Sequence, residues 1–289
     1  MRNRVSISTG ALPKAMGKLY YDFSAALSMM ERVWDSGVVD GFEFVCLDEW
    51  DQRWPPMEID LRREYRVANW ERSPKHSEKE IGGILSKSGV PILTLHSRFD
   101  IGPRLCSDSR QDIQRGKRLI HESLDLSQQL NCPVCVFHLW DTWGEMFDPR
   151  AIKETFEGIA SQYPAVKASV ENIPVSLPGY TPIRLVEDYD NVTADTGWAA
   201  LYDELEEFQR LTERIVNVHL AGRLKGNRWE LCAPGHPEVA ASFDFYKTLE
   251  AIRTSWGYQG LLTIEPKSLV QCSLDDLLGA IVTVNGAGR

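Results

Sequence analysis

The sequence lacks any apolar run long enough to cross a membrane. A membrane-spanning helix needs about 18 or more consecutive apolar residues, and no run in the 289 residues approaches that length. The first residues, from Met1 to Arg4, lead directly into a strand-like segment without the apolar core of a signal peptide. These absences predict a cytoplasmic protein that does not bind a membrane.

Cysteine and excess positive charge are also scarce. The six cysteines are scattered, unlike a disulfide framework, and the pair Cys132 and Cys135 lacks the second pair of a zinc ribbon. We interpret both as buried or strand-edge thiols. The net charge of −9 argues against a nucleic-acid partner, because basic residues supply most non-specific affinity for phosphates. One arginine cluster in the segment 47–77 remains a candidate for binding a phosphate: Arg53, Arg62, Arg63, Arg66 and Arg72.

Short apolar runs alternate with longer stretches of helical periodicity along the whole chain. Strands are predicted at residues 5–8, 41–46, 91–96, 134–139, 166–173, 191–195, 215–220 and 260–265. Helices are predicted around residues 26–34, 78–88, 152–160, 201–208, 245–256 and 274–281.

Eight strand-then-helix units without a break in composition predict one α/β domain over residues 1–289. We expect a single (β/α)8 TIM barrel with its active site at the C-terminal ends of the strands. An open doubly wound sheet would place a glycine-rich turn after its first strand, and the residues 8–11 are not one. Two long segments, 47–77 and 221–242, are predicted to be functional loops.

Residues that can bind a metal gather at the ends of the predicted strands. Six of the eight strands finish on such a residue: His96, His138, Glu171, Asp195, His219 and Glu265. A lone strand histidine is usually a hydrogen-bonded core residue, and a lone strand-end aspartate often caps the next helix. Together, however, these residues converge on one mouth, where several buried carboxylates resist ionisation without a cation. The pattern predicts a divalent-metal site and does not distinguish Mn, Zn, Co, Mg and Fe.

The sequence resembles the xylose isomerase-like superfamily. Six segments follow the order of that superfamily's strands: "ILTLHSRF", "CVFHLW", "KASVENIP", "NVTADTGWA", "IVNVHLAG" and "GLLTIEP". "DGFEFV" is similar to its second strand, with Glu43 where the family often has an acid. The superfamily contains sugar isomerases and epimerases, inosose dehydratase and endonuclease IV.

The resemblance implies roles for the strand-end residues. It implies that one shared metal is bound by Glu171, Asp195, His219 and Glu265. It implies that Glu171 and Glu265 also carry protons in catalysis. His96 and His138 match the histidines that hold a second metal, together with the fifth-strand glutamate, in the endonuclease IV branch; here they are candidates for a second metal or for substrate.

Two departures from the endonuclease IV pattern guide the functional prediction. The sixth-strand motif ends in Trp198 instead of a histidine, and "RWELCAPGHPE" contains no Asp-x-His. The sequence therefore predicts a metal-dependent sugar or sugar-phosphate isomerase or epimerase, which transfers a proton α to a metal-bound carbonyl. An endonuclease IV-like phosphodiesterase on abasic DNA and a sugar or inosose dehydratase remain alternatives.

The predicted partner is a small carbohydrate, and homo-oligomerisation is left open. Further candidates for substrate binding are Glu43, Trp140, Trp198, Arg223 and His236. The two tryptophans either stack on a sugar or fill the barrel mouth, and the sequence does not separate these roles.

Overall fold

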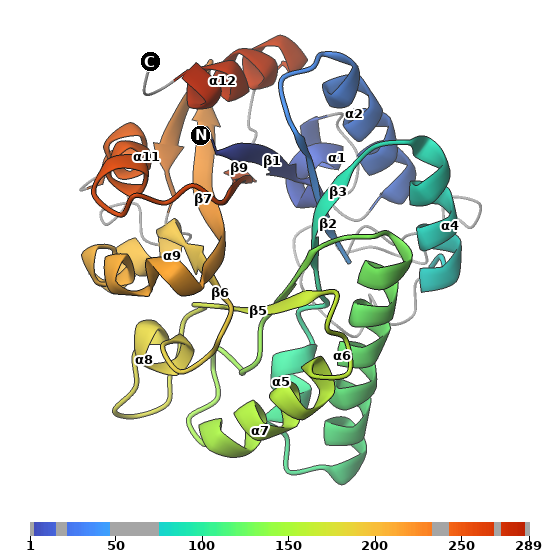
Figure 1. Cartoon of the computed structure of the whole chain (residues 1–289), viewed down its shortest axis with the longest axis vertical. Helices are drawn as coiled ribbons and strands as arrows, with labels where there is room; N and C mark the ends of the chain where they lie inside the picture. Colours follow the sequence, from blue (N-terminus) through green and yellow to red (C-terminus); the bar gives the residue numbers. More distant parts are fainter. Residues whose placement is uncertain (1–2, 16–21, 47–74, 233–242, 269–272, 287–289) are drawn as a thin grey trace.

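A closed ring of parallel strands forms the centre of the molecule (Figure 1). The computed structural model describes residues 3–15, 22–46, 75–232, 243–268 and 273–286. Within them the ring has the order β6-β5-β4-β3-β2-β1-β9-β7, and β7 pairs with β6 to close it. Its strands are β1 Arg4–Ser8, β2 Gly41–Val45, β3 Ile92–His96, β4 Val134–Phe137, β5 Lys167–Glu171, β6 Val192–Asp195, β7 Ile215–Lys225 and β9 Leu261–Ser268. The predicted (β/α)8 barrel is confirmed.

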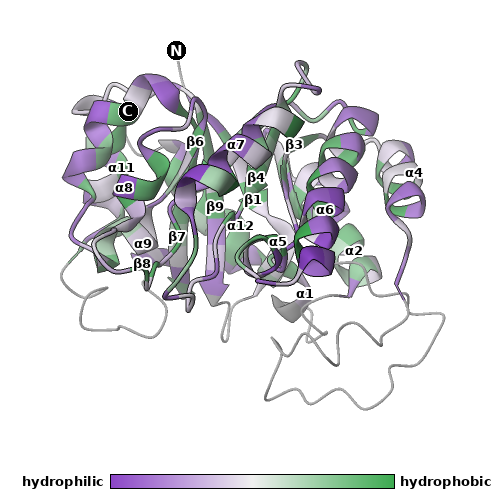
Figure 2. Cartoon of the chain, turned by 90° about the horizontal axis from the view of Figure 1, so that it is seen from below, coloured by the Kyte–Doolittle hydropathy of each residue, from purple (hydrophilic) through white to green (hydrophobic). Residues whose placement is uncertain are grey.

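Helices follow the strands and surround the ring (Figure 1). They are α1 Leu12–Ala15, α2 Phe23–Asp35, α4 Glu78–Ser88, α5 Ile101–Leu105, α6 Arg110–Gln129, α7 Pro149–Ala160, α8 Pro182–Val186, α9 Thr196–Leu201, α11 Phe245–Thr254 and α12 Leu274–Gly286, with the 3-10 helices η1 Thr9–Ala11 and η3 Glu206–Arg214. Figure 2 shows hydrophilic and hydrophobic residues sharing the surface of α6, as expected of an amphipathic helix. None of the helices in the described ranges is long and apolar enough to span a bilayer.

Local capping sets where several helices begin. The Ser77 hydroxyl accepts a hydrogen bond from the Glu80 backbone N–H, and the Glu80 carboxylate accepts one from the Ser77 backbone N–H. This capping box explains why α4 starts where the sequence predicts. Ser273 and Asp276 form the same reciprocal pair before α12. The helix starts therefore follow from short-range sequence.

Some predicted boundaries are wrong. Residues 201–208 do not form one helix: α9 ends at Leu201, and the chain turns through Asp203 at a φ of 58° before η3. The predicted strands 134–139 and 166–173 end earlier, at Phe137 and Glu171, and α11 ends at Thr254, before Trp256. Apolar residues continue past these ends because they are buried as loop residues, which periodicity does not separate from strand or helix.

The predicted loop 221–242 begins as a β-hairpin. β7 continues to Lys225, turns at Gly226 with a φ of 57°, and pairs in antiparallel fashion with β8 Arg228–Leu231. Residues 233–242, which include His236, lie outside the described residues. The same holds for residues 47–74, which contain the five clustered arginines.

The interior of the barrel is partly polar. Ser6 and Thr263 are joined through their hydroxyls at 2.8 Å, and the Thr263 hydroxyl donates to Asn217 Oδ1 at 2.8 Å. Successive strand residues point to opposite faces, so these polar side chains alternate with apolar ones such as Ile7 and Ile264, which belong to the hydrophobic core. The layer supports the strand-end residues above it. Cys132 and Cys135 are buried free thiols, as predicted.

Candidate metal centre

The structure brings the six predicted strand-end residues together in two groups that share Glu171. Within the described residues, one group is His96, His138 and Glu171, and the other is Glu171, Asp195, His219 and Glu265; in each, the ligand atoms lie within 4.8 Å of one another. Strand register explains the second group. Asp195 pairs beside His219, and Glu265 pairs beside Ala221, two residues further along β7. Side chains from neighbouring strands therefore reach the same end of the barrel.

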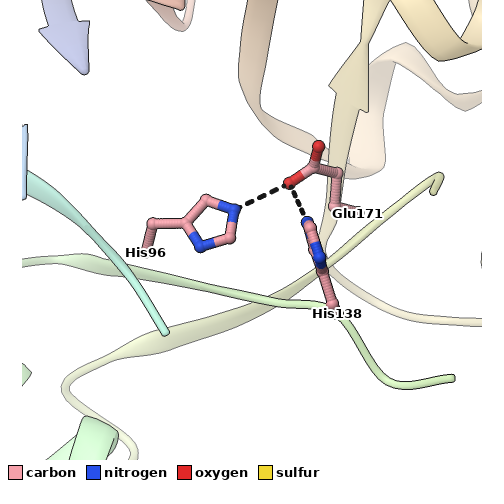
Figure 3. Close-up of side chains that lie close together, drawn as sticks. All are labelled: His96, His138 and Glu171. Carbon is pink, nitrogen blue, oxygen red and sulfur yellow. Dashed lines mark hydrogen bonds and ion pairs between the residues drawn. The ribbon is translucent and has the colours of Figure 1, made fainter. Parts of the chain in front are cut away.

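The first group is built around one carboxylate oxygen (Figure 3). Nε2 of His96 and Nε2 of His138 each lie 3.1 Å from Oε2 of Glu171. Nδ1 of His96 lies 2.9 Å from the Ser97 carbonyl, which only accepts hydrogen bonds. A neutral His96 that donates there would aim its Nε2 lone pair at a carboxylate. The pair therefore needs either a proton on Nε2 or a cation between the two atoms.

His219 in the second group is oriented from below by Glu43. Nε2 of His219 lies 2.9 Å from Oε2 of Glu43, which also accepts a hydrogen bond from the Thr94 hydroxyl at 3.0 Å. Nδ1 of His219 faces the mouth, 3.4 Å from Oε2 of Glu171 and 3.8 Å from Oε2 of Glu265. A carboxylate behind a histidine is the usual support of a metal ligand. Glu43, predicted as a candidate for substrate binding, lies fully buried beneath His219.

Asp195 both caps a helix and keeps one carboxylate oxygen that could bind a metal. Its Oδ1 accepts a hydrogen bond from the Trp198 backbone N–H at 2.9 Å and so caps α9. Its backbone is held by Asn172, whose Oδ1 accepts from Asp195 N–H and whose Nδ2 donates to the Asp195 carbonyl. Capping uses only one carboxylate oxygen, so Oδ2 is left for another partner.

Three of the four predicted ligands have a buried atom without a hydrogen bond. In the described part of the chain, Asp195 Oδ2, His219 Nδ1 and Glu265 Oε2 make no hydrogen bond. Such atoms are rare in native proteins and call for an explanation. Here they belong to one cluster of carboxylate and imidazole donors, a set that suits a divalent transition metal. The residues present therefore fit a metal ion.

Lys267 is a charged member of the site that the sequence analysis missed. Its Nζ lies 2.6 Å from Oε2 of Glu265, as an ion pair without hydrogen-bond alignment, and 3.4 Å from Oδ2 of Asp195. The same Nζ lies 5.8 Å from the centroid of the Trp198 ring. The strand period of two places residue 267 on the same side as residue 265. That signal was lost because the strand was predicted to end at Glu265.

Burial and neighbouring charges shift the pKa values of the cluster in opposite directions. Burial would raise the pKa of Glu171, but His219 and His138 lower that pKa well below its ordinary value. Burial raises the pKa of Asp195 to about 7, with Lys267 opposing the rise. Burial would lower the pKa of His219, but Glu43 and Glu171 raise it well above its usual range. Without a metal, the cluster therefore retains protons on Asp195 and His219 at slightly acidic pH.

The remaining predicted residues lie in different surroundings. Trp140 is only 3% exposed, and its Nε1–H donates to the Pro174 carbonyl at 3.0 Å, so its ring packs in the core. Trp198 is partly buried against the core beside Lys267. Arg223 is exposed on the β7–β8 hairpin and pairs with Glu230 at 2.6 Å.

Comparison with known proteins shows the fold. No family model matches the sequence, and no curated protein matches it. A D-tagatose 3-epimerase-like protein matches with a TM-score of 0.59 at 19% identity, covering 98% of this chain and 96% of that one. The 3-keto-D-glucoside 4-epimerase of E. coli matches with a TM-score of 0.61 at 10% identity, over 99% and 100%. A sugar phosphate isomerase/epimerase from Parabacteroides distasonis matches with a TM-score of 0.61 at 10% identity, over 100% and 95%.

These matches define the class of structure. The chain has the fold of the xylose isomerase-like TIM barrels, so the predicted resemblance is confirmed at the level of fold. Because one fold supports many chemistries, the activity has to be argued from the site.

Proposed function

We propose that this protein is a divalent-metal-dependent sugar or sugar-phosphate isomerase or epimerase. The observation that carries the proposal is the convergence of Glu171, Asp195, His219 and Glu265, whose ligand atoms lie within 4.8 Å of one another at the barrel mouth. The sugar isomerase and epimerase names of the matched structures support a small carbohydrate as the substrate.

The positions of the two glutamates support a role for both in proton transfer. Glu171 on β5 and Glu265 on β9 are separated in the ring by β6 and β7, so they flank Asp195 and His219. One carboxylate can remove a proton from the carbon next to a carbonyl while the other returns a proton. The pKa of Glu265 is lowered, because Lys267 and His219 outweigh the effect of burial, and the pKa of Glu171 is lowered further. Both groups are therefore ionised at neutral pH, as the one that removes a proton must be, and the one that returns a proton must take it up first.

A divalent ion held by this cluster would polarise the carbonyl and stabilise the negative charge that develops next to it. Asp195 and His219 would hold the ion, and Glu43 would keep Nδ1 of His219 turned toward it. These two ligands would serve binding, while Glu171 and Glu265 would serve both binding and proton transfer.

One observation favours a second candidate function. The convergence of His96 and His138 on Glu171 fits a second metal ion, as in an endonuclease IV-like phosphodiesterase. Trp198 in place of that branch's histidine and the net charge of −9 oppose this activity. A dehydratase would use the same carboxylates but would also expel a hydroxyl group of the sugar as water. We therefore favour isomerase or epimerase chemistry.

Hydrogen exchange tests the proposal directly. The purified chain would be analysed for metal, loaded with Mn²⁺, and incubated with ketoses and ketose phosphates in D2O. We expect NMR to show deuterium at the carbon next to the carbonyl and an isomer or epimer as product. Glu265→Gln should lose both signals, whereas Glu157→Gln, which removes an exposed charge on α7, should keep them. Cleavage of abasic-site DNA without exchange in any sugar would instead support the phosphodiesterase.

A further inference from the structure

Lys267 places the protein's own cation beside two of the proposed metal ligands. Its Nζ lies 2.6 Å from Oε2 of Glu265 and 3.4 Å from Oδ2 of Asp195. The Lys267 side chain is 18% exposed and that of Asp195 is fully buried. The ammonium group therefore reaches the cluster from the mouth, with its stem on β9.

The two oxygens that face Lys267 are the ones that a metal would use. In the described residues, Asp195 Oδ2 and Glu265 Oε2 are the buried carboxylate oxygens of the four-residue cluster that make no hydrogen bond. Asp195 Oδ1 is already occupied by the N-terminus of α9. A divalent ion and the ammonium group of Lys267 would therefore draw on the same pair of atoms.

The negative charge of the site gives both cations a reason to bind there. Four buried or nearly buried carboxylates, those of Glu43, Glu171, Asp195 and Glu265, lie around His219. Buried carboxylates are costly unless they are paired. Lys267 supplies part of that pairing when no metal is bound, and two cations that share the same oxygens repel each other.

We propose that Lys267 is a resident counter-ion that stabilises the metal-free protein and lowers its affinity for the divalent ion. The inference rests on the proposed metal site and adds that this site exchanges its ion instead of retaining it permanently. A lysine that merely positioned the carboxylates would have the opposite effect, because its removal would disorder the ligands and weaken metal binding. The sign of the change in affinity therefore separates the two roles.

The test measures Mn²⁺ affinity by titration calorimetry and thermal unfolding with EDTA and with saturating Mn²⁺, on the full chain. Lys267→Met removes the charge at similar length, Lys267→Gln is a second neutral variant, and Lys267→Arg retains the charge. Lys153→Met is the matched control, since it removes a lysine that pairs with Glu157 at 2.7 Å on α7.

We expect both neutral variants to bind Mn²⁺ about tenfold more tightly or better, since one competing unit charge is gone. In EDTA they should melt at a lower temperature than the wild type, and Mn²⁺ should raise their melting temperature by more. Lys267→Arg should stay within about threefold of the wild-type affinity, and Lys153→Met should leave the affinity unchanged.

Unchanged or weaker Mn²⁺ binding by the neutral variants, with the wild type binding Mn²⁺ normally, overturns the inference alone. Absence of Mn²⁺ binding in the wild type and in all variants overturns the metal site, and the inference with it. A neutral variant that folds only with Mn²⁺ supports the inference, because the ion then replaces the missing charge. If Lys267→Met folds under neither condition, Lys267→Gln decides by the same two measurements.

Discussion

The two sides of the barrel mouth balance their carboxylates in different ways. On the side of β3, β4 and β5, two imidazoles meet one carboxylate, because His96 and His138 both contact Oε2 of Glu171. On the side of β6, β7 and β9, two carboxylates meet one imidazole, and each of Asp195, His219 and Glu265 has a buried atom without a hydrogen bond in the described residues. Lys267 lies on this second side.

The difference indicates which side depends more strongly on a cation. An imidazole pair can neutralise one carboxylate by holding a proton, so the first side is stable without an ion. An excess of buried carboxylates can be neutralised only by protonation, by Lys267 or by a metal. We therefore expect the primary ion on the second side, with Glu171 linking the two.

The largest expected effect follows from removing the residue that the two sides share. Glu171→Gln leaves His96, His138 and His219 converging on a neutral amide, and it removes a proposed proton carrier. We expect activity to fall about 10³-fold and Mn²⁺ binding to weaken strongly, measured by kinetics and calorimetry. Glu157→Gln should change neither. Wild-type activity and metal affinity in Glu171→Gln would show that this cluster is not the site.

Lowering the pH should weaken metal binding on the second side. Asp195, with a pKa raised by burial to about 7, and His219, with a pKa raised well above its usual value, must release protons when a metal binds. Lowering the pH from about 7.5 to about 5.5 should therefore reduce Mn²⁺ affinity by about 100-fold or more, since each proton released contributes up to a factor of about ten per pH unit. Calorimetry in buffers of different ionisation enthalpy would count the protons released. An affinity that stays constant over this range would mean that the ligands are already deprotonated.

Removing both histidines of the first side should have a smaller effect. His96→Ala/His138→Ala leaves Asp195, His219 and Glu265 in place, so we expect about one ion per chain and less than about a tenfold change in its affinity. Elemental analysis of the wild type and the double variant measures this. Two ions in the wild type and one in the variant would establish a second ion on the first side. Loss of all metal would show that the two sides are not separable.

The smallest effect is expected from Trp140, which follows β4 on the first side. Trp140→Phe removes the hydrogen bond to the Pro174 carbonyl and leaves a buried acceptor without its partner. We expect the free energy of unfolding to fall by about 1–2 kcal/mol, measured with denaturant, and KM to remain unchanged. A large rise in KM at unchanged stability would instead show that the indole contacts a sugar.

Most of the candidate site could be predicted from the sequence because the barrel imposes a simple rule. The C-terminal ends of parallel strands share one face, so a His, Asp or Glu at each strand end predicts a cluster without any knowledge of register. Helix starts were predictable for a similar reason: Ser77 and Glu80 interact within one turn. Both signals depend on residues that lie close together in the chain, so a single sequence is enough to predict them.

The sequence by itself determined the (β/α)8 class, the strands that carry Glu171, Asp195, His219 and Glu265, and the capped helices. Only the tertiary structure decided that Glu43 supports His219, that Lys267 reaches Asp195, and that β7 continues into a hairpin with β8. Residues 43 and 219 meet because β2 and β7 face each other across the closed barrel, and residues 195 and 267 meet through the register of β6, β7 and β9. Register and barrel closure arise from packing between distant segments, and no local pattern in the chain records them.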